Sequence, residues 1–181
     1  DRLGIETRMA TDPAIALVAE AHSLGELEAL HTFARQQSYR SFQLGIACAP
    51  GLAQLAGSLS ENITLLQRGQ KALWMAEQHT DASLAGWLSP HCQYGEHYLR
   101  DLVNASLYEP KATGWAKALD HDRFSYSGQA SLSGSLWKIE EFMQQPVKSR
   151  PGDTIAHTEL YLADSDQFEF LSDEQHQVMG G

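Results

Sequence analysis

Apolar residues recur at helical spacing along most of the chain. Leu132, Leu136, Ile139 and Met143 stand at positions i, i+4, i+7 and i+11, which places their side chains on one face of a helix. Proline and glycine separate the periodic segments from one another. We therefore predict an all-α fold whose helices cover residues 12–25, 26–39, 58–76, 95–109, 115–119, 132–145 and 154–163.

Capping signals support several of the helix ends. Asp12 offers an N-cap with Pro13 at the first helical position, and Ser58 with Glu61 forms a capping-box pattern. Residues 40–57 contain several glycines and a proline. We expect an irregular loop there, with at most a short helix inside it.

Length and composition place the chain among single globular domains. It has 181 residues, of which 43% are hydrophobic, so it can bury a core, and we expect one domain over residues 1–181. The longest unbroken apolar run is residues 14–19, whereas a membrane-spanning helix needs roughly 20 such residues. The net charge of −10 and the scattered basic residues argue against nucleic acid as a partner.

The two cysteines and eight histidines limit the metal sites and disulfides that the chain can form. Cys48 and Cys92 are too few for a disulfide-rich scaffold; we expect them free and buried, although pairing in an oxidising compartment stays open. Glu28 and His31 have the carboxylate-imidazole spacing of di-iron helix bundles, but the best second pair is only Asp173 to His176. We therefore expect no metal and no cofactor.

Four short motifs follow one another in a familiar order. They are Ala34-Arg35-Gln36-Gln37-Ser38, Gly51-Leu52-Ala53-Gln54-Leu55, Gly95-Glu96-His97-Tyr98-Leu99-Arg100, and Tyr126 with Trp137 eleven residues later. This order resembles the catalytic domain of the soluble lytic transglycosylases, bacterial enzymes related in fold to goose-type lysozyme. The resemblance covers about residues 26–162.

The resemblance implies a lysozyme-like domain with a groove for peptidoglycan glycan strands. Cleavage in that family is non-hydrolytic and forms a 1,6-anhydro sugar, so one carboxylic acid suffices. Here Gln37 occupies the acid position, with Ser38, Gln54 and Tyr126 implied as substrate-binding residues. An amide cannot act as that acid, so the implied enzyme, a periplasmic or secreted cell-wall lyase, is inactive or merely binds glycan as it stands. Gln37→Glu is then expected to produce anhydro-muropeptides.

A second class of protein stays open beside the enzyme. Gly57, Ile63, Leu66 and Ala72 are spaced loosely as in a tetratricopeptide repeat, and Gly95 opens a similar helix. This alternative predicts a helical module that binds a protein partner. The acidic charge of the chain counts against an anionic wall polymer as the ligand, without excluding it.

Overall fold

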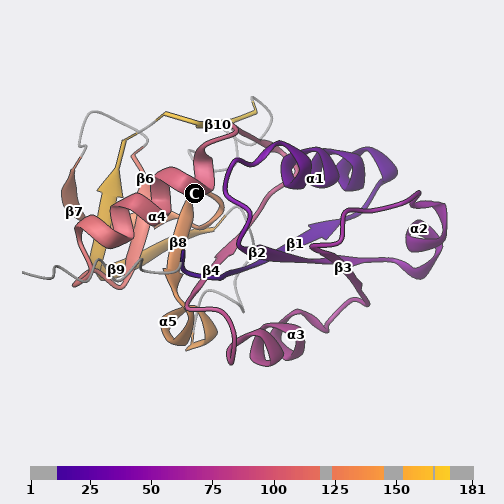
Figure 1. Ribbon diagram of the computed structural model, residues 1–181, viewed down its shortest axis with the longest axis horizontal. Coiled ribbons are helices and arrows are strands. Elements are labelled where there is room, and N and C mark those ends of the chain that lie inside the picture. The colour runs from indigo at the N-terminus through magenta and orange to yellow at the C-terminus, as the bar shows by residue number, and fades with distance from the viewer. Residues whose placement is uncertain (1–11, 119–123, 145–152, 165, 172–181) are drawn as a thin grey trace, which may run out of the picture.

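A mixed β-sheet, and not a helical bundle, forms the centre of the molecule (Figure 1). The computed structural model describes residues 12–118, 124–144, 153–164 and 166–171. Within them, eight strands pair in the order β3-β2-β1-β4-β8-β6-β9-β7, and β5 pairs with β10 in a separate small sheet. The strands of the large sheet are β1 (Ile15–Ala21), β2 (Phe42–Cys48), β3 (Ile63–Leu66), β4 (Leu84–Trp87), β6 (Gly114–Lys117), β7 (Ser125–Ser131), β8 (Ser135–Lys138) and β9 (Thr154–Ala163). The small sheet consists of β5 (Cys92–Tyr94) and β10 (Phe168–Phe170).

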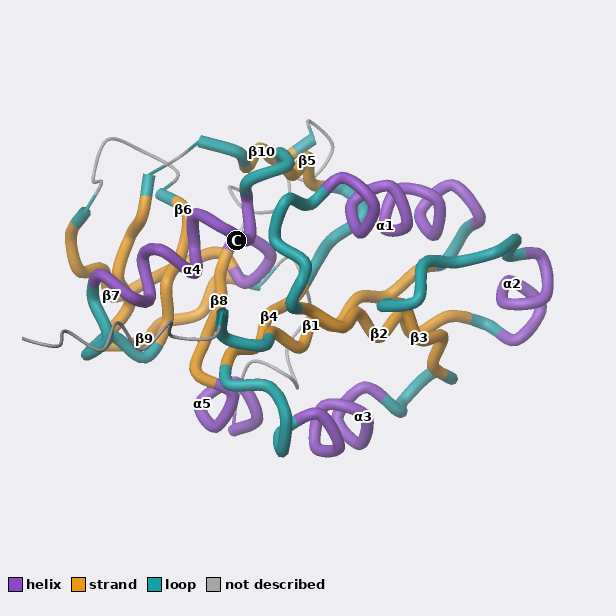
Figure 2. The backbone as a smooth tube through the Cα atoms, in the orientation of Figure 1, coloured by secondary structure: helices purple, strands orange, loops and turns teal. Residues whose placement is uncertain are grey.

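Helices cover both faces of the large sheet. α1 (Leu24–Gln36) and α4 (Tyr98–Tyr108) lie on one face, while α3 (Lys71–Gln78) and α5 (Ile139–Gln144) lie on the other (Figures 1 and 2). The short α2 (Pro50–Leu55) connects β2 with β3, and a 3-10 turn (Leu132–Gly134) precedes β8.

Strand β1 shows why this sheet is buried on both sides. Its side chains alternate, with Ile15 and Leu17 in the core under α1 and α4, and Ala16 and Val18 in the core under α3 and α5. A strand that packs on both faces needs apolar residues at every position, so it has no polar face and no two-residue period. The continuous apolar run therefore looks like part of a helix in the sequence, and the predicted helix over residues 12–25 is wrong.

Most strands point the same way. β1, β2, β3 and β4 run parallel to one another, and β9 runs parallel to β6. β8 is antiparallel to both β4 and β6, so β6 has the direction of β4. The carboxyl ends of β1 to β4, β6 and β9 therefore share one edge of the sheet.

The all-α fold class is wrong, and so is the lysozyme-like architecture. Residues 154–163 have the predicted bounds but form β9, residues 115–117 of the predicted helix 115–119 belong to β6, and the predicted helix 58–76 contains β3 and the beginning of α3. Residues 132–145 contain β8 before α5 begins. The tetratricopeptide alternative fails for the same reason, because stacked helix pairs leave no place for a sheet.

Parts of the prediction are confirmed. The helices expected over 26–39 and 95–109 correspond to α1 and α4. The short helix allowed within 40–57 is present as α2, but the irregular loop expected there is wrong, because Phe42–Cys48 form β2. Cys48 and Cys92 are both buried and free, as expected. In the described part of the chain, no helix combines the length and apolar character that crossing a bilayer requires. The single-domain expectation stays a prediction.

Candidate functional site

Gln37, the residue at the implied acid position, is fully buried at the end of α1. Its Nε2 donates a hydrogen bond to the carbonyl of Gly95 at 2.8 Å, and its Oε1 accepts one from the backbone N–H of Leu99 at 3.1 Å. Both halves of the amide therefore join the end of α1 to the beginning of α4. The side chain has a structural role and presents no surface to a ligand.

The other implied site residues do not gather around Gln37. Ser38 is its exposed neighbour, and the Ser38 Oγ lies 2.9 Å from Nδ1 of His97. Gln54 is exposed on α2, whereas Tyr126 is half-exposed on β7, and these two elements lie at opposite ends of the sheet (Figure 1). Together with the α/β fold, this separation overturns the predicted peptidoglycan-cleaving or peptidoglycan-binding function and its lyase activity. The segment 146–152, part of the resemblance, lies outside the described residues.

The order of the strands points to a different place in the molecule. From β1 the chain builds outward through β2 and β3 in one direction, and then crosses back to add β4 on the other side of β1. The chain after β1 and the chain after β4 lead to α1 and α4 on one face of the sheet, whereas the loop after β3 leads to α3 on the other face. In open α/β sheets, ligands bind in the crevice at the carboxyl ends of the strands where the order reverses in this way.

Acidic, basic and histidine side chains contact one another at this edge of the sheet, and we call them the edge cluster: Glu20, His22, Glu26, Arg68, Lys71 and His91. They come from the carboxyl ends of β1, β3 and β4 and the helices that follow. Lys71 Nζ donates to Glu20 and also lies 4.2 Å from the ring centre of Trp87. The Lys71 ammonium is therefore held in place from two sides.

Glu26 connects the β1 loop with the β4 loop. Its carboxylate accepts a hydrogen bond from the backbone N–H of His22 and lies 3.3 Å from Nε2 of His91. The Ser23 Oγ caps α1 by accepting from the backbone N–H of Glu26 at 3.2 Å. The beginning of α1 is thus occupied by its own capping groups.

Arg68 brings the third loop into the cluster. Its Nη2 lies 3.3 Å from Nδ1 of His22, and since a guanidinium can only donate, the Nδ1 atom accepts. The other ring nitrogen of His22, Nε2, lies 3.7 Å from a carboxylate oxygen of Glu20. Arg68 is an exposed residue.

The loop before α3 has the features of an anion-binding turn. Gly69 has a φ of 87°, in the left-handed region, and an added Cβ there would meet nothing within 4 Å. α3 begins at Lys71 without a side-chain cap and without an acidic residue in its first turn. Its first backbone N–H groups are therefore available to an anion beside Arg68.

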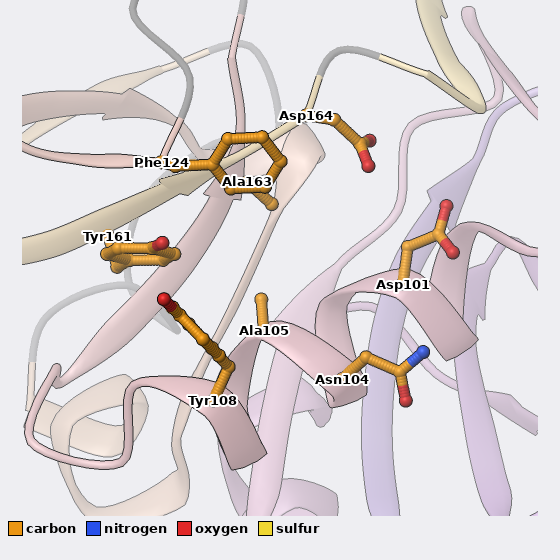
Figure 3. A pocket seen from close by; sticks show the side chains of 8 residues that line it. All are labelled: Asp101, Asn104, Ala105, Tyr108, Phe124, Tyr161, Ala163 and Asp164. Atoms are coloured by element: carbon orange, nitrogen blue, oxygen red, sulfur yellow. The ribbon is translucent and has the colours of Figure 1, made fainter.

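A separate pocket lies further along the same edge (Figure 3). Its volume is about 370 Å³, and it lies between α4 and the carboxyl end of β9. Its lining residues are Asp101, Asn104, Ala105, Tyr108, Phe124, Tyr161, Ala163 and Asp164. Lys117, the last residue of β6, lies behind the pocket. Its side chain is fully buried and forms salt bridges with Asp101 and Asp164.

Neither the edge cluster nor the pocket was predicted from the sequence. The edge cluster depends on where β1, β3 and β4 end, and the pocket depends on β9 lying beside α4, and the sequence pattern predicts none of these four strands. The signal that could have indicated the pocket is Lys117, a lysine inside the apolar stretch of residues 114–118. Among the described residues, no group of three His, Cys, Asp or Glu side chains is arranged to hold a metal ion.

Comparison with known proteins supports the fold and goes no further. No family model matches the chain, and no curated protein matches it. Solved structures do match, among them the crystal structure of Rv0371c from Mycobacterium tuberculosis H37Rv, with a TM-score of 0.53 and 12% sequence identity. The match covers 94% of this chain and 100% of that chain. At this identity the likeness shows a shared α/β fold alone.

Proposed function

We propose that the edge cluster binds a phosphorylated small molecule of the nucleotide class. The observation that carries the proposal is that Arg68 and the uncapped beginning of α3 meet the β1 loop at the reversal of strand order. Nucleotides bind α/β sheets at such a place, with their phosphates against the N-terminus of a helix.

The charges of the cluster support an anionic ligand. Glu20 and Glu26 already have cationic or imidazole partners, namely Lys71, His22 and His91. Arg68, by contrast, contacts an imidazole and no carboxylate among the described residues. Its guanidinium is therefore the positive group that a phosphate can pair with, and its fork geometry suits two phosphate oxygens.

The experiment is calorimetric titration with UDP, ADP, GDP and CDP, and with inorganic pyrophosphate, at low ionic strength. We expect at least one nucleoside diphosphate to bind, and Arg68→Gln to weaken that binding about tenfold or more, which corresponds to about 1.4 kcal/mol. Arg68 is exposed, so the substitution is expected to leave the fold intact.

Arg35→Gln is the matched control. Arg35 is also exposed, but it lies in the last turn of α1, at the end of that helix far from the edge cluster. Its removal should not change the affinity. Absence of binding by all the diphosphates, or an equal loss in the two variants, would contradict the proposal.

A further inference from the structure

The pocket between α4 and β9 has two chemically different walls (Figure 3). Tyr108, Tyr161 and Phe124 stand on one side, and Asp101 and Asp164 stand on the other. Ala105 and Ala163 lie between the two walls, and their small side chains leave the space open. A ligand in this pocket would contact aromatic rings and carboxylates at the same time.

The carboxylate wall carries an unbalanced negative charge. Lys117 Nζ donates to Asp101 Oδ2 at 3.1 Å and to Asp164 Oδ1 at 2.8 Å, and the lysine side chain has no exposed surface. Two carboxylates thus share one ammonium, which leaves a net charge of −1. Both aspartates remain partly exposed, with 27% and 32% of their side-chain surface accessible. The uncompensated charge therefore faces the pocket and not the protein interior.

The two tyrosine rings of the aromatic wall contact each other, and Tyr108 is 75% exposed. The rings of Tyr108 and Tyr161 are 6.3 Å apart, and Tyr126 packs edge-on against Tyr161 at 5.7 Å. The pKa of Tyr161 is raised, mainly by burial and to a smaller extent by the nearby Tyr108 and Glu109. Its phenol therefore stays protonated near neutral pH. The side chain of Phe124 is 66% exposed. Its backbone has a φ of 54°, a conformation that is costly for a bulky residue.

We infer that this pocket binds a small organic molecule through a protonated or methylated amine. An alkylammonium group is attracted to the faces of aromatic rings and to carboxylates, and this pocket offers both on opposing walls. The ligand would supply the positive charge that Lys117 alone does not provide. The inference concerns a second site and does not depend on the nucleotide proposal.

The test compares two molecules of the same shape that differ in charge. Choline carries a quaternary ammonium, and 3,3-dimethyl-1-butanol is its uncharged analogue. We expect saturable shifts of protein NMR signals with choline and none with the alcohol. Asp101→Asn and Tyr108→Leu should each weaken choline binding about fivefold, since each removes one of the two attractions.

Leu107→Ala serves as the control for Tyr108→Leu. Leu107 neighbours Tyr108 on α4 and is 61% exposed, but it does not line the pocket. Its removal should leave choline binding unchanged. Circular dichroism of each variant verifies that the fold is retained, and Asp101→Asn leaves Asp164 as a partner of Lys117.

Two results would overturn the inference. One is equal behaviour of choline and its neutral analogue, which would show that charge plays no part. The other is binding of glucose with the same dependence on Tyr108 while choline does not bind, which would identify a site for neutral polyols. Loss of nucleotide binding in Arg68→Gln bears on neither result, so the two proposals can fail separately.

Discussion

Gln37→Glu is expected to destabilise the protein by about 2–4 kcal/mol and to release no anhydro-muropeptides from peptidoglycan. The Nε2 atom of Gln37 donates to the carbonyl of Gly95 in a fully buried position. A carboxylate there has no donor, so two oxygens would face each other without solvent. The free energy of unfolding from urea titration measures the loss.

The pH dependence of the stability loss in Gln37→Glu distinguishes a missing hydrogen-bond donor from a packing defect. Burial would raise the pKa of the introduced carboxyl, and its protonated form can still donate to the carbonyl of Gly95. The variant should therefore be closest to the wild type at acid pH, and its deficit should grow as the pH rises through the raised pKa.

Gln36→Glu is the matched control, since it makes the same chemical change at the neighbouring exposed residue. It should alter stability by less than about 0.5 kcal/mol. Equal stability of the two variants, or production of anhydro-muropeptides by Gln37→Glu, would contradict the structural role of Gln37.

Lys117→Met is expected to destabilise the protein by about 2–3 kcal/mol. Methionine fills the space of the lysine stem but leaves Asp101 and Asp164 without the ammonium that now bonds to both. The cost lies below that of a wholly buried ion pair because the two carboxylates keep contact with water. Urea unfolding near neutral pH measures it.

Two companion variants show whether charge is the cause. Lys111→Met removes an exposed lysine in the loop between α4 and β6 and should change stability little. Adding Asp101→Asn and Asp164→Asn to Lys117→Met should recover part of the lost stability, because no unpaired carboxylate then remains. If the triple variant is less stable than Lys117→Met alone, the explanation by unpaired charge is wrong.

The elements that the sequence predicted correctly are those that keep a polar face. α1 buries Leu27, Leu30, Phe33 and Ala34 on one side and exposes charged residues on the other, so its period is visible in the sequence. α4 behaves in the same way. The bounds of β9 agree with the predicted segment 154–163, but the segment is a strand and not a helix.

The candidate sites could not be predicted because their partners are far apart in sequence. Lys117 meets Asp101 and Asp164 at separations of 16 and 47 residues, and Arg68 meets His22 at a separation of 46. These pairs come together only because parallel strands place their carboxyl ends on one edge. Without the strands, each residue looked like an ordinary surface charge.

Two of the four motifs that resemble a transglycosylase meet in the structure. Gln37 and the segment that begins at Gly95 are indeed in contact, but the contact is a buried pair of hydrogen bonds between two helices. The sequence by itself determined the amphipathic helices α1 and α4 and the acidic net charge, and it favoured free, buried cysteines while leaving their pairing open. Only the tertiary structure shows the sheet, because strands that are buried on both faces lack the alternation of polar and apolar residues that would reveal them in the sequence. The sheet in turn determines which charged residues, distant in sequence, lie at the same edge.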